Sequence, residues 1–264
     1  MNVQTTNSIA VGESTAELIL RLALDVGEGM LKNGGEVSRV ENTVARICRA
    51  WGADHVEVFS IISVINASVH MPNGTRSTQM RRIHATGTDM YKLELLNALS
   101  RDICEHKIAP EEVDARIGQI KRARAYHPYT AIPASAVAAS AFAVFFGGGL
   151  SEALVALFIG ALLGVIDLFA TGRINDLAKT LVSAFVAGLL SSVAALLLGG
   201  ADSGIIMIGT IMLLVPGVAF GTALRDLLCG DLIAGGLKTM QAILASLMIA
   251  FGYLLSMAVM GGAL

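Results

Sequence analysis

The sequence predicts an α-helical integral membrane protein in which five transmembrane helices follow a small cytoplasmic α+β domain. Of the 264 residues, 54% are hydrophobic and 15% are charged, whereas charged residues make up about 25% of a soluble globular protein. The charges are also unevenly placed, because 15 of the 19 lysines and arginines lie before residue 130. A soluble domain followed by a membrane domain explains both observations.

The soluble part is expected over residues 14–128, after a disordered N-terminus at 1–13. Ser14 and Glu17 form a capping-box pattern at the start of a helix. Apolar positions with helical spacing continue to residue 33, where Asn33-Gly34-Gly35 indicates a helix end. Alternating β-branched residues and a Pro-Asn-Gly turn predict a small sheet. The expected elements are helices at 14–33, 36–51, 89–106 and 110–125, and strands at 56–59, 64–69 and 76–83.

The membrane part is expected over residues 129–264. Each apolar stretch is close to the ~20 residues that a helix needs to cross a bilayer. The basic run Lys121-Arg122-Ala123-Arg124 stands just before the first stretch, and the few later cations fall in alternate loops. The positive-inside rule then puts the N-terminal domain in the cytoplasm and the C-terminus outside, in a cytoplasmic (plasma) membrane. The five spans are expected at 131–149, 152–170, 178–199, 204–224 and 239–261.

The fourth span is interrupted by Pro216 and Gly217, and charges follow at Arg225, Asp226 and, after Gly230, Asp231. Proline removes a backbone donor, and such a break survives in lipid only where protein or water satisfies the freed carbonyls. These residues are therefore candidates for a substrate or ion pathway. The alternative is an ordinary kink followed by a border pair that only orients a loop.

Asp167 is a further candidate, because it continues the face of Gly160 and Gly164 in the second span. A carboxylate inside a span is costly unless it takes a proton or pairs with a cation, so Asp167 is a possible proton or substrate relay. The alternative places it at the cytoplasmic end of the helix, in water.

A separate motif, the first in chain order, lies at residues 33–41 and contains Gly35, Glu36, Ser38, Arg39 and Glu41. Acids in a first helical turn complement the helix dipole, which is the simplest interpretation. The spacing is not that of a phosphate-binding loop, and nothing around Ser38 has the pattern of a hydrolase nucleophile. We therefore expect no enzyme activity and no cofactor.

The remaining composition excludes several other classes. The cysteines Cys48, Cys104 and Cys229 have no metal-ligand spacing, so no metal site is expected. A formal net charge of −2 gives no basic surplus for nucleic acid. The expected surroundings are the lipid bilayer, a small-molecule substrate and another membrane protein chain.

The two motifs together resemble the threonine/serine exporter family. The resemblance rests on Asn33 to Glu41 and on Pro216-Gly217, Arg225-Asp226, Gly230-Asp231 and Gly235, in that order along the chain. It implies a secondary, proton-coupled exporter of small amino acids or, in split relatives, small dicarboxylates.

Fused members of that family look like two membrane halves with about ten spans, whereas five are expected here. The resemblance therefore implies a split form that works with a small integral membrane partner subunit, or a homo-oligomer. The alternative function is a membrane-anchored sensor or assembly subunit whose cytoplasmic domain binds a small ligand.

Overall fold

The computed structural model describes residues 14–84, 86–105 and 108–261, so the N-terminus expected to be disordered, 1–13, lies outside the described residues. The chain forms two compact units. The first unit consists of Met1–Arg124 together with Arg225–Gly235, and the second of Ala125–Leu224 together with Gly236–Leu264. A short segment from late in the sequence thus belongs to the N-terminal domain.

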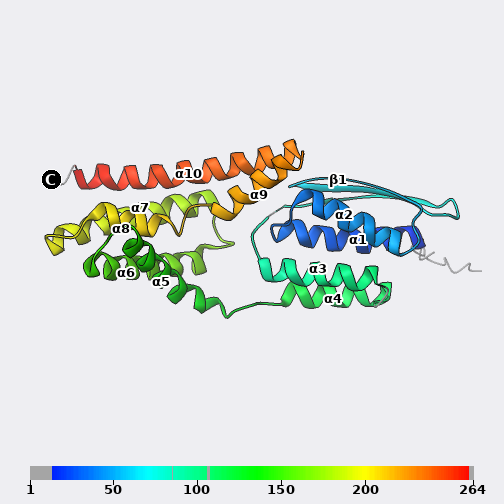
Figure 1. Ribbon diagram of the computed structural model, residues 1–264, viewed down its shortest axis with the longest axis horizontal. Helices are drawn as coiled ribbons and strands as arrows, with labels where there is room; N and C mark the ends of the chain where they lie inside the picture. Colours follow the sequence, from blue (N-terminus) through cyan, green and yellow to red (C-terminus); the bar gives the residue numbers. More distant parts are fainter. Residues whose placement is uncertain (1–13, 85, 106–107, 262–264) are drawn as a thin grey trace, which may run out of the picture. The chain divides into compact units, whose positions relative to one another are not determined.

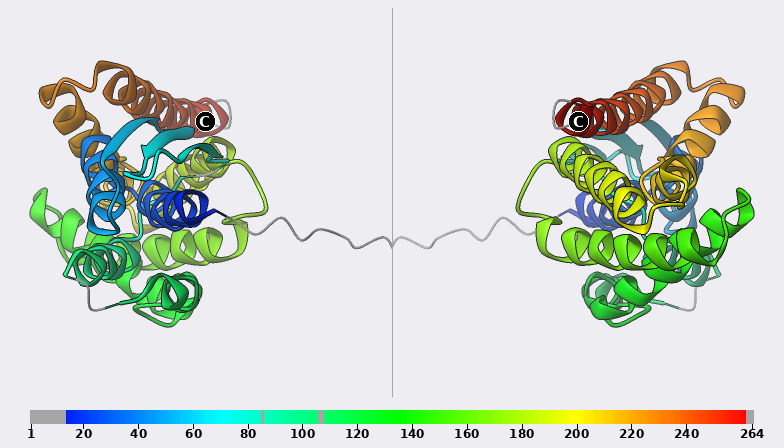
Figure 2. Two further views of the ribbon diagram at one scale, coloured as in Figure 1. Left: turned by 90° about the vertical axis from the view of Figure 1, so that its right-hand side faces the viewer. Right: turned by 90° about the vertical axis from the view of Figure 1, so that its left-hand side faces the viewer.

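The first unit contains a three-stranded antiparallel sheet in the order β1-β2-β3 and two pairs of helices. Helices α1 and α2 lie between the sheet and the pair α3 and α4 (Figure 1; Figure 2, left). The elements are α1 (Thr15–Lys32), α2 (Val37–Ala50), β1 (His55–Ile61), β2 (Val64–His70), β3 (Arg76–Arg82), α3 (Met90–Cys104) and α4 (Pro110–Arg122).

Local sequence signals explain where these elements begin. The Ser14 side chain accepts a hydrogen bond from the Glu17 backbone, and the Glu17 side chain accepts one from Ser14, so the expected capping box is present. Asp89 caps α3 by accepting from the Lys92 backbone. Pro110 opens α4, where its missing N–H is not needed. The end expected for α3, residue 106, lies outside the described residues.

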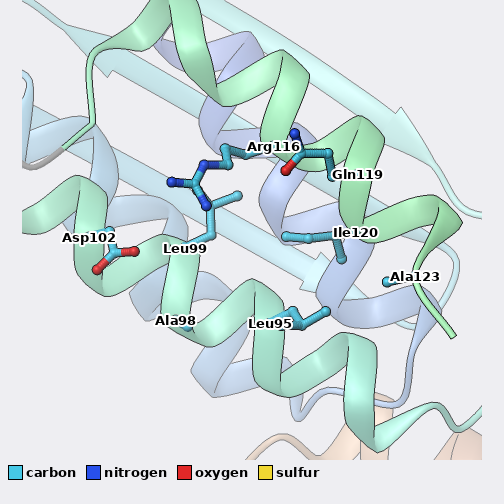
Figure 3. Close-up of a pocket in the computed structure, with 8 residues that line it drawn as sticks. All are labelled: Leu95, Ala98, Leu99, Asp102, Arg116, Gln119, Ile120 and Ala123. Atoms are coloured by element: carbon cyan, nitrogen blue, oxygen red, sulfur yellow. The ribbon is translucent and has the colours of Figure 1, made fainter. Parts of the chain in front are cut away.

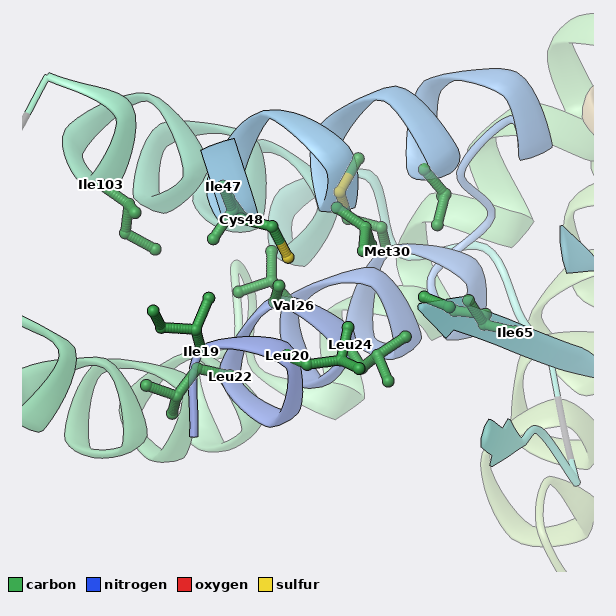
Figure 4. Packing of buried hydrophobic residues seen from close by; sticks show 14 of the residues in the cluster. Ile19, Leu20, Leu22, Leu24, Val26, Met30, Ile47, Cys48, Ile65 and Ile103 are labelled. Atoms are coloured by element: carbon green, nitrogen blue, oxygen red, sulfur yellow. The ribbon is translucent and has the colours of Figure 1, made fainter. Parts of the chain in front are cut away.

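The core of the first unit is built on α1, which is buried on several sides. Side chains of α1 pack with Ile47 and Cys48 of α2, Ile65 of β2 and Ile103 of α3, all of which are fully buried (Figure 4). Each buried aliphatic side chain contributes about 1.5–3 kcal/mol relative to exposure. The segment Arg225–Gly235 takes part through Ala234, which is 2% exposed and belongs to the same core.

The return strand differs from the prediction in one respect. The polar sequence of residues 76–83 predicts an edge strand with Arg76, Arg81 and Arg82 in solvent, and Arg76 and Arg82 are exposed. Arg81 instead points inward and its Nε lies 3.3 Å from Asp25 of α1. The side-chain alternation of the strand puts Arg81 on the covered face, where Asp25 neutralises it.

The second unit is helical. Within the described residues, four segments are long and apolar enough to cross a membrane: Pro128–Phe145, Leu150–Ala170, Asp176–Leu198 and Leu232–Gly261. Its elements are the 3-10 turn η1 (Pro128–Thr130), α5 (Ala131–Phe145), α6 (Leu150–Ala170), α7 (Asp176–Leu198), α8 (Ser203–Ile211) and parts of α9 (Gly217–Leu228) and α10 (Leu232–Gly261), as Figure 1 and the right-hand view of Figure 2 show.

The count of five uninterrupted spans is not confirmed. The predicted fourth span, 204–224, is divided between α8 with 9 residues and α9 with 12. At a rise of about 1.5 Å per residue, neither reaches across a hydrocarbon core of about 30 Å. The break covers residues 212–216 and ends at Pro216, the residue that lacks a backbone donor.

The fifth predicted span, 239–261, lies within a longer helix. Helix α10 begins at Leu232 and runs for 30 residues, through Gly235 and Gly236. The sequence predicts a loop between the fourth and fifth spans that contains both glycines, because glycine costs about 1 kcal/mol in a helix relative to alanine.

Close helix contacts in the second unit occur at small residues. A Cβ atom added to Gly160 of α6 would lie 2.6 Å from the Ser135 carbonyl oxygen of α5. A Cβ added to Gly188 of α7 would lie 2.2 Å from the Ser256 Oγ of α10. Small residues at such positions let helix backbones approach closely in membranes.

Candidate functional site

The motif at residues 33–41 forms the turn between α1 and α2. Gly34 has φ +91°, in the left-handed region that favours glycine. Gly35 passes so close to α1 that an added Cβ would lie 2.9 Å from the Met30 carbonyl oxygen. Glu36 occupies the N-cap position of α2, but its side chain makes no capping hydrogen bond. The tight turn therefore presents the Glu36 carboxylate to another part of the chain.

That other part is the second motif, Arg225–Gly235, which turns from α9 into α10. Gly230 has φ +94°, and the Asp231 backbone N–H donates to the Asp226 carbonyl at 2.9 Å. An added Cβ at Gly235 would lie 2.7 Å from the Leu227 Cγ and 2.8 Å from its backbone nitrogen. Glycine at 230 allows the turn, and glycine at 235 allows the two helices to approach each other.

The two motifs meet at an ion pair within the first unit. The Arg225 Nη1 donates to the Glu36 Oε1 at 2.6 Å, across 189 positions of sequence. The Glu36 side chain is 13% exposed and the Arg225 side chain is 64% exposed. Hydrogen bonding to Glu36 and its negative charge raise the pKa of the Arg225 guanidinium. An almost buried acid thus holds a cation that remains accessible to solvent.

Three further carboxyl groups belong to the same region. Asp226 is 1% exposed, and the Oδ2 atom of Asp231 is buried and accepts no hydrogen bond from the described residues. Glu41 accepts from the Ser60 backbone N–H at 2.6 Å and from the Ser60 hydroxyl at 3.2 Å. Burial raises the pKa of Glu41, the Ser60 hydrogen bonds oppose this, and the charge of Asp231 adds to it.

Glu41 and Asp231 are therefore close enough to interact electrostatically, although they come from different motifs. Burial is the main cause of the raised Glu41 pKa, and the charge of Asp231 contributes less.

Ser38 and Arg39, the remaining residues of the first motif, lie away from the ion pair. Arg39 is exposed and Ser38 is half-buried. No side-chain hydrogen bond or ion pair joins either of them to another residue in the described part of the chain. The structure thus brings Gly35, Glu36 and Glu41 together with the second motif, and leaves Ser38 and Arg39 outside the contact.

Pro216 and Gly217 lie at the start of α9 in the second unit. The Gly217 backbone N–H donates to the Val215 carbonyl at 2.8 Å, and the Phe220 N–H donates to the Pro216 carbonyl at 2.9 Å. Pro216 is half-buried and Gly217 is exposed. Gly217 and Gly221 have the four-residue spacing that predicts a close helix contact, but nothing described lies within 4 Å of an added Cβ at either position.

Asp167 does not point into the helix bundle. Its side chain is 62% exposed at the end of α6, and its Oδ1 lies 2.7 Å from the Lys179 Nζ of α7. It also accepts a hydrogen bond from the Thr171 hydroxyl. This geometry is that of the border position, the alternative to a relay inside the bundle.

Sequence reasoning missed two polar contacts inside the second unit. Glu152 of α6 is 7% exposed and accepts from the Gly149 and Asp202 backbone N–H groups at 2.8 and 3.0 Å. Its position three residues after Gly149 was a capping signal that could have been used. The Tyr253 hydroxyl of α10 lies 3.1 Å from the Thr210 hydroxyl of α8, and both residues are buried. No sequence signal pairs these two.

Among the described residues there is no group of three or more His, Cys, Asp or Glu that could hold a metal ion. The site consists instead of an exposed cation on a nearly buried acid, flanked by the buried Asp226 and the half-buried Asp231 and Glu41.

These features define a class of protein: a helical membrane protein with a broken helix and a separate N-terminal unit that carries a cluster of ionisable groups. Residues 21–260 match the family described as "Putative threonine/serine exporter" (ThrE). The match covers most of the chain, and the chain belongs to this transporter family.

Two bacterial relatives match over nearly their whole length. The chain is 25% identical to the "Probable succinate transporter subunit YjjP" of Klebsiella aerogenes, over 94% of this chain and 96% of the relative. It is 24% identical to the protein of the same name from Escherichia coli, over 92% of this chain and 95% of the relative.

A fungal relative is much longer. The "Pheromone-regulated membrane protein 10" of Zygosaccharomyces rouxii is 22% identical over 91% of this chain, but the match covers only 25% of that protein. No solved structure matches the chain.

Proposed function

We propose that this chain is a subunit of a secondary transporter that exports small amino acids, such as threonine and serine, or small organic acids across the cytoplasmic membrane. Its membership of an exporter family supports this proposal, as do the four apolar helices long enough to span a bilayer. The bacterial relatives are named as succinate transporter subunits, which keeps small dicarboxylates among the candidate substrates.

The observation that carries the proposal is the ion pair between Arg225 and Glu36. The segment 225–235 continues directly into α9 on one side and α10 on the other. This segment belongs to the first unit, and the chain connects it directly to the parts of α9 and α10 that belong to the second unit. We propose that export requires the ion pair, so that the N-terminal domain is part of the transport machinery.

Within this scheme Arg225 is the residue that meets the substrate carboxylate. Its guanidinium is 64% exposed although it is paired, so a carboxylate in solution can approach it and compete with Glu36. Asp226, nearly completely buried, and Asp231 provide negative charge for a substrate amine or a proton. Gly230 gives the turn on which these groups are presented.

The break at Pro216 and Gly217 is proposed as the part of the pathway inside the membrane. A helix that starts in the middle of a membrane unit offers unpaired backbone N–H groups and a positive dipole end to an anionic group. Helix α9 starts at Gly217, directly after the break. Asp167 is proposed as a border ion pair with Lys179 that orients the turn between α6 and α7.

We propose Glu41 as the group that couples export to protons. Burial, with a smaller contribution from the charge of Asp231, raises the pKa of Glu41, so a proton taken up there is held more strongly than on an ordinary glutamate. Protonation removes the charge of Glu41 beside the second motif and so changes how firmly the two motifs hold together.

A second membrane chain is proposed to complete the transporter. The bacterial relatives are named as subunits, and a small integral membrane partner or a second copy would supply the remaining helices. The charge distribution supports a cytoplasmic N-terminal domain and an external C-terminus.

The test is efflux of radiolabelled threonine and succinate from loaded cells that express the chain with its genomic neighbours. We expect Arg225→Ala and Asp226→Ala to abolish efflux while membrane insertion remains intact, because they remove the groups at the junction of the motifs. Arg49→Ala is the matched control, since Arg49 is an exposed arginine on α2 away from the site. Unchanged efflux in both variants would remove these residues from the mechanism.

The alternative function, a membrane-anchored sensor or assembly subunit, is favoured by one observation. The first unit has a cavity of about 240 Å³ among α1, α3 and α4, lined in part by Asn33, Lys92 and Lys121. A sensor requires ligand binding there and no efflux dependence on Arg225, so the same variants distinguish the two functions.

A further inference from the structure

A second cavity lies between α3 and α4, and neither sequence motif lines it. Its volume is about 200 Å³. It is lined by Leu95, Leu99 and Asp102 of α3 and by Arg116, Gln119 and Ile120 of α4 (Figure 3). Both helices belong to the first unit, so the cavity lies within one compact body.

One end of this cavity is charged. Figure 3 shows the Arg116 guanidinium and the Asp102 carboxylate toward the same end of the cavity, near Leu99. These opposite charges do not neutralise each other, since no ion pair or hydrogen bond joins them to one another or to a different side chain in the described ranges. A cation and an anion that share a cavity without pairing are available to a ligand with both charges.

The other end is apolar. Figure 3 places Leu95, Ile120 and Ala123 away from the charged pair, around the far part of the cavity. Burying an aliphatic group there is favourable because it removes apolar surface from water. The Gln119 amide lines the same cavity and can both donate and accept hydrogen bonds.

We propose that this cavity binds a free α-amino acid with an aliphatic side chain. The ligand carboxylate pairs with Arg116, the geometry for which a planar guanidinium is suited. The ligand ammonium group pairs with Asp102, and the side chain lies against Leu95 and Ile120. The proposal does not rest on export, because none of these residues belongs to the two motifs.

The same charges select against other small metabolites. A dicarboxylate such as succinate would place its second carboxylate near Asp102, where like charges repel. A diamine would place a cation near Arg116. The site is therefore specific for a zwitterion rather than for small acids in general.

The experiment is equilibrium dialysis of radiolabelled L-leucine against the purified full chain in detergent. We expect saturable binding of one ligand per chain, competed by aliphatic L-amino acids and not by succinate. The analogues 4-methylpentanoate and isoamylamine, which lack the amine and the carboxylate of leucine respectively, should each bind about tenfold more weakly or worse, because each loses a charge-assisted hydrogen bond.

Two variants test the assigned contacts. Arg116→Gln should weaken leucine about tenfold or more and should make leucine and isoamylamine bind equally, since the carboxylate has lost its partner. Asp102→Asn should also weaken leucine binding and should make leucine and 4-methylpentanoate bind equally, since the ammonium group has lost its partner. A purely structural role for either residue would not change this ligand preference. Arg49→Gln and Glu94→Gln, exposed charges outside the cavity, are the matched controls and should bind as the original chain does.

Three results would overturn the proposal: no saturable leucine binding, stronger binding of succinate than of leucine, or leucine binding that persists in both cavity variants. The last result would put the ligand elsewhere in the chain. None of these outcomes bears on efflux through Arg225, so the site and the proposed export activity fail separately.

Discussion

Gly235 gives the sharpest prediction about the packing of the second motif. An alanine Cβ at this position would lie 2.7 Å from the Leu227 Cγ and 2.8 Å from the Leu227 backbone nitrogen. The Leu227 side chain can rotate, but the backbone nitrogen can yield only if α9 and α10 move apart. Gly235→Ala should therefore loosen the segment 225–235.

The neighbouring Gly236 provides a matched control in the same helix. Nothing described lies within 4 Å of an added Cβ there. Both substitutions gain about 1 kcal/mol of helix propensity, whereas only Gly235→Ala meets an overpacking cost of about 1–3 kcal/mol. The difference between the two variants is thus about 1–3 kcal/mol.

Hydrogen exchange of the full chain in detergent measures this difference locally. Backbone amides of residues 226–235 should exchange roughly 5- to 150-fold faster in Gly235→Ala than in Gly236→Ala, because about 1.4 kcal/mol corresponds to a factor of ten. Amides of α3 and α4 serve as an internal reference. Equal exchange in the two variants would refute the close approach of α9 and α10 at Gly235.

Three further predictions follow from the described contacts. Glu41→Gln should stabilise the first unit near pH 7 in thermal unfolding. The pKa of Glu41 is raised in the folded state, so above about pH 4.5 the carboxyl ionises more readily in the unfolded state and the folded state loses stability. The stabilisation by Glu41→Gln should therefore vanish toward pH 4. A stabilisation that does not depend on pH would contradict the raised pKa of Glu41. Gly188→Ala should lower the free energy of unfolding by about 1–3 kcal/mol, because the added methyl group overpacks against Ser256. Adding Ser256→Ala to this variant should restore part of the lost melting temperature in detergent. No restoration would mean that the strain does not arise at Ser256. Glu152→Gln should lower the melting temperature, since an amide turns a donor toward the Gly149 or Asp202 N–H, whereas Glu94→Gln, at an exposed position, should leave it unchanged.

Local sequence signals were sufficient to predict most helices and strands of the first unit. The capping box at Ser14 and Glu17 and the glycines after Lys32 fixed α1 within one residue at each end. The alternation of side chains predicted all three strands, because one face of the sheet is covered by α1 and α2. Arg81 was misplaced because its burial depends on Asp25, a partner 56 positions away.

The structure of the second motif and of the helix break before it was only partly predictable from the sequence. The break before Pro216 was predictable from the missing backbone donor, but the early start of α10 was not. Gly235 suggested a loop, whereas the structure uses it for contact with Leu227 inside a helical hairpin. The pairing of Arg225 with Glu36 depends on tertiary folding across 189 positions, and no spacing rule reaches that far.

The proposed roles of Pro216, Gly217, Arg225, Asp226, Gly230, Asp231 and Asp167 remain predictions about transport. Their geometry separates them into two groups. Arg225, Asp226 and Asp231 gather with the first motif, while Asp167 lies at a helix end with Lys179. A functional test should therefore begin with the first group.

A charge exchange at the ion pair tests the central claim most directly. Arg225→Glu and Glu36→Arg should each reduce efflux of labelled threonine or succinate, because each places two like charges at a contact of 2.6 Å. The chain carrying both substitutions should regain a clear part of that efflux, since it restores an opposite-charge pair. If the double variant is as inactive as the single ones, or if the single variants export normally, the contact between the two motifs is not what transport depends on.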